Sequence, residues 1–207
     1  MKTISNRQLE RFPIYLKYLL SIRDSDLVDI SAPSIGKALG FSSEQVRKDL
    51  QVVAKSEGKP NRGRDINGLI KDIQSFLGYD VVDNAIIIGV GHLGKAFMNY
   101  AGFKEFGLNI IAGFDIDKSL IGQKINDKPI YDLANLEEIM EYMNVKVAII
   151  SVPSSSAQDV VNRVVNIGIK GIWNFVPTHI AVPEDVVIEN VNLASSLAVL
   201  SHKLRSK

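Results

Sequence analysis

Residues 86–94 read Ile86-Ile87-Ile88-Gly89-Val90-Gly91-His92-Leu93-Gly94, so three glycines with the spacing G-x-G-x-x-G directly follow an apolar run. Such a run is typical of a strand that is buried on both faces of a parallel sheet. In the predicted strand-turn-helix, the first glycine permits the tight turn, the second lets the backbone approach a pyrophosphate, and the third lets the helix pack against the sheet. The pyrophosphate would lie on the helix N-terminus, whose free N–H groups favour anions.

An acidic residue follows this loop at a suitable distance. Asp115 ends the next apolar run, residues 109–114, and lies about 20 residues after Gly94, the spacing typical of dinucleotide sites. A carboxylate there accepts hydrogen bonds from the adenosine ribose and repels a 2′-phosphate, which predicts NADH or NAD⁺ rather than NADP(H). The alternative is that the glycines only form a turn and Asp115 only caps a strand. We interpret His92 as a positioning or surface residue, not a catalyst.

Alternating strands and helices continue to the end of this region. Apolar runs at 145–152 and 171–175 predict two further strands, and helices are expected at about 93–102, 136–143 and 155–167. This alternation predicts an α/β fold, a Rossmann domain with a doubly wound parallel sheet and helices on both faces. Val152 and Pro153 close the third strand and should line the nucleotide cleft. Ser154, Ser155 and Ser156 could cap the next helix.

The first 78 residues have a different, helical pattern. Leu9, Phe12, Leu16 and Leu19 recur at helical spacing, and a second short helix after Ser31 ends at Gly40. Ser42 and Gln45 predict a capping box at the start of a third helix, whose buried stripe is Val46, Leu50 and Val53. A further helix is expected at 69–77, and residues 78–84 mark the domain boundary.

A short helix, a tight turn and a second capped helix over residues 31–54 fit a helix-turn-helix. The candidate DNA contacts on the second helix are Ser42, Ser43, Gln45, Arg47 and Lys48. Arginine binds guanine O6 and N7 bidentately, and glutamine binds adenine in the same way. The basic turn that follows resembles a wing reaching phosphates or a minor groove, with Lys59, Arg62 and Arg64 as candidate contacts. The alternative is a three-helix bundle with a solvated basic edge.

Composition adds weaker constraints. The formal net charge of the 207 residues is +1, yet the first 75 residues carry more basic than acidic side chains and the rest carry more acidic ones, which suggests an anionic partner for the N-terminal part. The absence of cysteine fits a reducing cytoplasm. The N-terminal segment lacks the features of a signal peptide, and no apolar run is long enough to span a bilayer. We expect no metal site.

The two parts together resemble the Rex family of redox-sensing transcriptional repressors over nearly the whole chain. The resemblance is carried by residues 45–50 (Gln-Val-Arg-Lys-Asp-Leu), the glycine loop 89–94, and residues 99–103, 114–117, 168–175 and 189–193. It implies a winged helix-turn-helix domain (1–78), a Rossmann NAD(H)-binding domain (79–192) and a C-terminal dimerisation helix (193–207) that is exchanged between the subunits of a homodimer. It also implies that NADH releases the protein from double-stranded operator DNA.

The C-terminal sequence agrees with a partner helix, because Leu193, Leu197, Leu200 and Leu204 form an apolar seam. The alternative is that this helix folds back on its own domain. At the end of the fourth strand, Asn174, Phe175 and Pro177 are expected to contact the cofactor, with the latter two beside the nicotinamide. The resemblance adds Tyr100 as a further cofactor-linked residue.

Two features depart from the family pattern. Val53 and Ala54 replace the Phe-Gly that begins the family's wing, and Arg64 falls near an aromatic position. The family also often has an acid where Asn192 stands, paired with a tyrosine at the position of Tyr100. Because oxidised nicotinamide is positively charged, loss of that acid should weaken NAD⁺ binding relative to NADH.

Two other functions stay open at this point. The first is an NAD-dependent oxidoreductase, although little chain follows the motif to form a substrate domain and His179 and His202 are isolated. The second is a CoA-binding module, because the Rossmann region also resembles the nucleotide domain of succinyl-CoA ligases around residues 168–172. Asp115 argues against CoA, whose ribose carries a 3′-phosphate.

Overall fold

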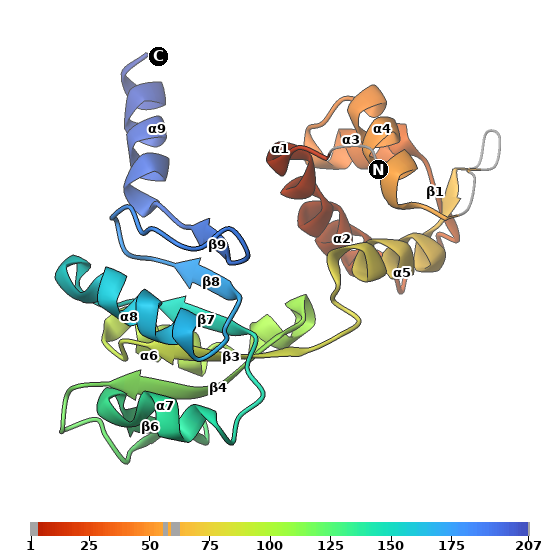
Figure 1. Cartoon of the computed structure of the whole chain (residues 1–207). Helices are drawn as coiled ribbons and strands as arrows, with labels where there is room; N and C mark the ends of the chain where they lie inside the picture. Colours follow the sequence, from red (N-terminus) through yellow and green to blue (C-terminus); the bar gives the residue numbers. More distant parts are fainter. Residues whose placement is uncertain (1–3, 56–57, 59–62, 207) are drawn as a thin grey trace. The chain divides into compact units, whose positions relative to one another are not determined.

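The structure is a computed structural model that describes residues 4–55, 58 and 63–206 (Figure 1). The chain divides into two compact units, residues 1–81 and 82–207. The predicted boundary after residue 78 falls in the segment that joins them, where Gly78 takes a left-handed φ of 73° that residues with a Cβ rarely adopt. None of the described helices is both long and apolar enough to cross a membrane.

The N-terminal unit is mainly helical. Its elements are α1 (Asn6–Leu9), α2 (Arg11–Ser21), β1 (Asp29–Ile30), α3 (Ala32–Leu39), α4 (Ser43–Val53), β2 (Arg64–Asp65) and α5 (Ile66–Leu77). Phe12, Leu16 and Leu19 are buried, as their spacing predicts. Leu9 is 46% exposed, so the prediction that it shares their face is wrong. The reason is that the helix is interrupted at Glu10, which separates α1 from α2.

Helices α3 and α4 form the predicted helix-turn-helix. Ser42 Oγ accepts a hydrogen bond from Gln45 N at 3.1 Å, which confirms the predicted N-cap of α4. Gly40 ends α3 with a φ of 74°. A Cβ on Gly36 would lie 2.6 Å from Phe41 O, so only glycine permits this close approach between the helix and the turn. The turn, the glycine that ends α3 and the serine that caps α4 could therefore all be predicted from the sequence.

A small antiparallel ladder flanks the helix-turn-helix in the sequence, because β1 precedes α3 and β2 comes after α4, at the end of the segment predicted to form a wing. Strand β1 pairs with β2, with Asp29 opposite Asp65 and Ile30 opposite Arg64. Gly63 has a φ of 97°, and a Cβ there would collide with the Ile30 backbone. Of the predicted wing contacts, Arg64 lies in β2, whereas Lys59 and Arg62 lie outside the described residues.

The second unit contains a seven-stranded sheet in the order β5-β6-β4-β3-β7-β8-β9 (Figure 1). Its strands are β3 (Asp83–Ile88), β4 (Leu108–Asp115), β5 (Lys124–Ile125), β6 (Lys128–Asp132), β7 (Val147–Ile150), β8 (Gly171–Asn174) and β9 (Val187–Asn190). All neighbours are parallel except the β5–β6 hairpin. The chain starts in the middle at β3, winds outward through β4 and β6, and returns to β7 on the other side. Open sheets of this type bind ligands where the winding reverses, at the carboxyl ends of the strands.

Helices cover both faces of this sheet. Side chains alternate along each strand, so the apolar strands present buried side chains to both faces. Ile86 and Ile88 point into the core formed with α7 (Leu136–Met140) and α8 (Ser154–Asn166). Ala85 and Ile87 point to the other face, where they join Met98 of α6 (His92–Asn99). The short 3₁₀ helices are η1 (Ala101–Phe106) and η2 (Leu133–Asn135). The structure thus agrees with the predicted doubly wound architecture.

Several predicted boundaries are wrong. The helix expected at 93–102 ends at Asn99, because Tyr100 is extended (φ −78°, ψ 114°) before η1 begins. The helix expected at 136–143 ends at Met140. Strands β5, β6 and β9 are additional to the four predicted. β5 has only two residues and β9 is largely exposed, while β6 begins with Lys128 and ends with Asp132, so it lacks a continuous apolar run.

The chain ends in helix α9 (Leu193–Arg205), which begins at Asn192 as N-cap. None of its described residues is buried. The four leucines of the predicted seam are 54–68% exposed. Within its own unit, therefore, this helix leaves its apolar face uncovered.

Candidate functional site

The three glycines of the loop between β3 and α6 have different surroundings. Gly89 has a φ of 92°, and a Cβ there would collide with the Ser151 backbone. A Cβ on Gly94 would collide with the carbonyl oxygen of Gly89, which explains why α6 packs so closely under the loop. A Cβ on Gly91 would meet nothing within 4 Å. Gly89 and Gly94 therefore serve the fold, while Gly91 borders open space.

Asp115 lies at the end of β4 and binds the glycine loop. Its Oδ2 accepts a hydrogen bond from Val90 N at 2.5 Å, and its Oδ1 accepts from Ile116 N and Asp117 N at 2.7 and 2.9 Å. Val90 is completely buried, so this bond fixes the loop from below. A carboxylate has about four lone-pair sites, so Asp115 keeps acceptor capacity for ligand hydroxyls.

A cavity of about 500 Å³ lies where the winding of the sheet reverses. It is lined by Gly89, Gly91, Asp115, Ile116, Leu133, Ser151, Val152, Pro153, Ser156 and Val160. The structure thus brings the glycine loop, the acid and the predicted Val152 and Pro153 together at one site. Apolar side chains on one side and a carboxylate with backbone N–H groups on the other suit a nucleoside joined to phosphates.

Ser151 is a residue of this site that sequence reasoning missed. Its Oγ donates a hydrogen bond to Gly89 O at 2.7 Å and so links the ends of β7 and β3. The expectation that the following serines cap α8 is wrong, because the N-cap is Pro153 and no side chain caps it. Ser156 instead donates to Pro153 O at 3.0 Å. No side chain therefore caps the start of α8, which lies beside the cavity.

The remaining predicted cofactor residues do not line this cavity. Leu93 is half-buried at the start of α6 and His92 is exposed. Tyr100 is 53% exposed, packs on Phe103 at a ring distance of 4.9 Å and lines a separate cavity of about 190 Å³. Pro177 lines a third cavity of about 300 Å³ with Asn192. Within a single chain, Tyr100 and Pro177 therefore do not line the cavity at the glycine loop.

Asn174 and Phe175 are committed to internal contacts. Asn174 is fully buried; its Nδ2 donates to Asn190 Oδ1 at 2.8 Å and to Val176 O at 3.1 Å. We therefore correct the expectation of a direct cofactor contact by this side chain, which holds the loop after β8. Phe175 is half-buried and packs edge-on against Phe97 and Trp173, each at a ring distance of 4.8 Å.

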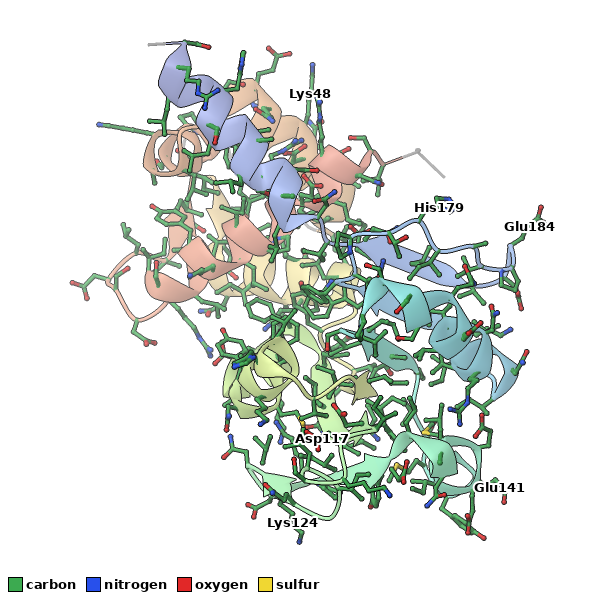
Figure 2. The ribbon with its side chains drawn as sticks, turned by 90° about the vertical axis from the view of Figure 1, so that its left-hand side faces the viewer. Lys48, Asp117, Lys124, Glu141, His179 and Glu184 are labelled. Carbon is green, nitrogen blue, oxygen red and sulfur yellow. The ribbon has the colours of Figure 1, made fainter. Side chains whose placement is uncertain are left out.

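The candidate DNA-reading residues lie along the exposed side of α4. Ser42, Ser43, Arg47 and Lys48 are exposed, and Lys48 projects from the helix into solvent (Figure 2). Lys48 Nζ lies 2.7 Å from Glu44 Oε1, and the hydrogen bond from this lysine lowers the pKa of Glu44. Arg47 and Arg64 line a cavity of about 470 Å³ between α4 and the base of the wing. The structure thus brings one predicted wing residue together with the predicted reading helix.

Asp49, on the same helix, points inward and was not singled out by sequence reasoning. It is 2% exposed and binds Arg11 bidentately, with Nε to Oδ2 at 2.6 Å and Nη2 to Oδ1 at 2.8 Å. Tyr15 Oη also donates to Asp49 Oδ2 at 2.7 Å. Burial is the largest cause that raises the pKa of Tyr15 far above its usual range, and the hydrogen bond to Asp49 is the second. The position of Asp49 in the sequence could have indicated this role. It lies beside Leu50 on the apolar stripe of the helix, where a buried carboxylate needs a partner.

Comparison with known proteins gives two family matches. Residues 82–178 match the family described as "CoA binding domain", and residues 3–51 match "Putative DNA-binding protein N-terminus". Curated relatives match over nearly the whole chain. The "Redox-sensing transcriptional repressor Rex" of Clostridioides difficile (strain 630) is 39% identical over 204 residues, which cover 99% of this chain and 97% of that protein. The Rex of Clostridium botulinum (strain Hall) is 40% identical over 200 residues, which cover 97% of this chain and 95% of that protein.

The chain belongs to the Rex family. Solved structures agree with this assignment. A crystal structure of RSP in complex with beta-NAD⁺ and operator DNA matches with a TM-score of 0.92 and 34% identity, covering 100% of this chain and 94% of that one. RSP in complex with beta-NADH matches with a TM-score of 0.88 and 33% identity, covering 100% and 96%. The resemblance predicted from the sequence is therefore confirmed, together with the fold class.

Within the Rex family, the atypical positions of this chain occupy defined places. Val53 is buried at the end of α4, and Ala54 forms the C-cap. Asn192 Oδ1 accepts a hydrogen bond from Ser195 N at 3.0 Å and so caps α9. Aspartate caps helices as well as asparagine does. Capping alone therefore does not explain why asparagine stands at this position.

Proposed function

We propose that this protein is a DNA-binding transcriptional repressor that responds to the NADH/NAD⁺ ratio through its Rossmann unit. The observation that carries the proposal is the cavity at the sheet reversal, where Gly91 borders open space and Asp115, which accepts three backbone hydrogen bonds, keeps about one further acceptor site. The residues present fit NAD(H): the uncovered N–H groups at the start of α6 would bind the pyrophosphate, and Asp115 would bind the ribose hydroxyls. The apolar Ile116, Leu133 and Val160 would contact the adenine. The bound dinucleotide would act as a signal and not as a reactant, because the protein would respond only to whether it is oxidised or reduced.

Helix α4 supplies the DNA-reading surface in this proposal. A helix-turn-helix presents the exposed side of its second helix to the major groove. Ser43, Gln45, Arg47 and Lys48 would face the bases and phosphates, and Arg64 with the wing would contact the adjacent backbone. Lys59 and Arg62 stay sequence predictions for the wing.

The coupling requires two subunits. A palindromic operator needs two reading helices at a fixed spacing, so we infer a homodimer. The exposed leucine seam of α9 is the candidate dimer contact, consistent with a helix exchanged between subunits. NADH would favour a dimer whose reading helices no longer match the half-site spacing, because a ligand shifts a population only towards the state it binds more tightly. We propose a cytoplasmic protein, where DNA and the nicotinamide pool meet.

Two alternatives receive less support. For an oxidoreductase, the curated relatives are named as repressors, and the two histidines that could act as acid or base do not gather: the exposed His179 lies in the loop after β8 (Figure 2), and the exposed His202 lies on α9. We therefore propose that the protein is not an enzyme. For a CoA-binding module, the matching family description is the favourable observation. Asp115 opposes it, because a carboxylate at the ribose repels a 3′-phosphate.

The proposal is tested in two steps. Thermal unfolding with NADH, NAD⁺, NADPH and CoA should show the largest stabilisation with NADH, because only ligands that bind the folded state raise its melting temperature. Selection from a random duplex pool should then recover a palindromic sequence, and NADH should release the protein from it. Stabilisation by CoA alone would favour the CoA-binding module, and turnover of NAD⁺ with a substrate would favour the oxidoreductase.

A further inference from the structure

Arg11 connects three elements of the N-terminal unit. Besides its two bonds to Asp49 of α4, its Nη1 donates to Arg7 O of α1 at 2.8 Å. The Arg11 side chain is only 17% exposed, and that of Asp49 only 3%. Tyr15 of α2 fixes the same carboxylate from a second direction. The guanidinium is therefore held in one position by partners that cannot move independently.

This fixed guanidinium determines the orientation of Gln45, a candidate reading residue on α4. In the amide orientation that satisfies hydrogen bonding, Gln45 Oε1 accepts from Arg11 Nε and Nη1, both at 3.2 Å. The opposite orientation would place the amide NH₂ against the guanidinium, donor against donor. Because the single hydrogen of Arg11 Nε is already accepted by Asp49 Oδ2 at 2.6 Å, Nη1 is the main donor to Gln45, and it keeps Oε1 turned toward Arg11. What Gln45 retains for a partner outside the chain is its pair of N–H donors.

We propose that Arg11 and Asp49 act as positioning residues that fix α4 and make Gln45 a hydrogen-bond donor only toward DNA. The inference deepens the proposed function and rests on it. Gln45 is half-buried and lines a cavity of about 420 Å³ together with Ser5, Gln8, Ser42 and Lys48, at the N-terminal end of α4. This surface offers donors to an acceptor group of the nucleic acid.

The consequence is a change in the base that Gln45 reads. Glutamine binds adenine bidentately by accepting from N6 and donating to N7, which requires a free Oε1. With Oε1 engaged by Arg11, Gln45 suits an acceptor: guanine O6 and N7, thymine O4, or a phosphate oxygen. The expectation from sequence, that glutamine reads adenine, is thereby replaced.

The experiment uses the full chain and a pool of duplexes randomised over the binding site. The wild type first selects its preferred duplex, and Gln45→Ala then identifies any base position whose preference depends on Gln45. A dependent G·C pair supports the proposal, and so does an affinity loss without a change in base preference, which indicates a phosphate contact. A dependent A·T pair is resolved by replacing its adenine with purine, which lacks the N6 amino group: unchanged affinity indicates a contact to thymine O4 and supports the proposal, whereas lost affinity indicates a contact to adenine and overturns it. No effect of Gln45→Ala also overturns it. Failure of the wild type to select any sequence would instead refute the proposed function itself.

The positioning role is tested with Arg11→Met combined with Asp49→Leu. Replacement of a buried ion pair by apolar residues of similar volume is often tolerated, so the fold should persist. The wild-type duplex should bind about 5- to 100-fold more weakly, the range for one good base contact, and adenine should become acceptable at the Gln45 position. The control is Arg163→Met with Glu137→Leu, another bidentate pair at 2.6–2.7 Å, located in the Rossmann unit.

Circular dichroism and melting temperature show whether each variant folds. If the double variant unfolds, Arg11→Lys provides the same test, because lysine retains the charge beside Asp49 without the rigid fork that holds Gln45. Unchanged affinity and base preference in a folded variant, matching the Rossmann control, would overturn the positioning role.

Discussion

Asp115 Oδ2 accepts the backbone N–H of Val90 at 2.5 Å, so the acid expected to bind the ribose also holds the glycine loop. The bond joins the end of β4 to the turn after β3, on the side of the sheet where the winding reverses. Loop shape and ligand recognition therefore depend on the same carboxylate, and the first prediction separates these two roles.

Asp115→Asn keeps an oxygen that accepts from Val90 N but turns its NH₂ toward Ile116 N and Asp117 N, so the melting temperature of the variant is measured beside its NADH affinity. NADH affinity should fall about 10- to 100-fold, since hydrogen bonds to charged groups contribute about 1.5–3 kcal/mol. Isothermal titration calorimetry measures the change. The matched control is Asp117→Asn, whose carboxylate instead accepts from Ser119 N at 2.8 Å; it should alter NADH affinity little. Equal losses in both variants would contradict the role of Asp115.

Gly94→Ala should mainly lower stability, whereas Gly91→Ala should mainly weaken NADH binding. Gly94→Ala pushes a methyl group against the Gly89 carbonyl and should destabilise the Rossmann unit by up to about 3 kcal/mol. Gly91→Ala enters open space and should change stability by about 1 kcal/mol or less. It should nevertheless weaken NADH binding about 10-fold or more, because the methyl group occupies the approach of the pyrophosphate. Thermal unfolding and NADH titration separate the two effects, and a Gly91→Ala protein with normal NADH affinity would contradict the assignment.

The sequence was sufficient where one local rule decides the outcome. The glycine spacing, the Ser42 cap, Gly40 and the buried run at residues 85–88 each depend on neighbours in the chain, and the structure agrees with them. The Rossmann layers follow because alternating strands and helices admit few arrangements.

The sequence was insufficient where a contact joins distant segments. The Arg11–Asp49 and Ser151–Gly89 bonds connect residues far apart in the chain, so no local pattern marks them. Asn174 has a typical binding-residue identity, but tertiary packing buries its side chain. Strands β5 and β9 are short or exposed and pair through the sheet rather than through their own hydrophobicity.

Asn192→Asp should improve NAD⁺ binding more than NADH binding. The oxidised ring carries a positive charge, and a nearby partly exposed carboxylate contributes about 1 kcal/mol, or roughly 5-fold in affinity. Because aspartate also accepts from Ser195 N as a helix cap, α9 should persist, which circular dichroism checks. Titration calorimetry with both nucleotides measures the difference. Equal effects on NAD⁺ and NADH would place Asn192 away from the nicotinamide.

Tyr15→Phe should destabilise the N-terminal unit by about 1.5–3 kcal/mol at neutral pH, since it removes a hydrogen bond to buried Asp49. Burial and Asp49 raise the pKa of Tyr15 above its usual value of 10.0, so the folded state holds this proton more tightly than the unfolded state. That contribution is complete below pH 10 and is lost as the pH rises through the folded-state pKa. The stability difference between wild type and Tyr15→Phe should therefore be constant up to about pH 10 and shrink above it. Urea unfolding at pH 8 and 10.5 measures this, with the exposed Tyr142→Phe as control; a difference that does not shrink would contradict it.

The most direct test of the redox-sensing account is a closed thermodynamic cycle on the selected operator duplex. Fluorescence anisotropy gives the affinity for DNA with and without saturating NADH, and calorimetry gives the affinity for NADH with and without DNA. Linkage requires the two ratios to be equal, and typical coupling is about 5- to 150-fold. The account predicts that NADH weakens DNA binding within that range and that DNA weakens NADH binding by the same factor. An affinity for the operator that is unchanged by saturating NADH would contradict it.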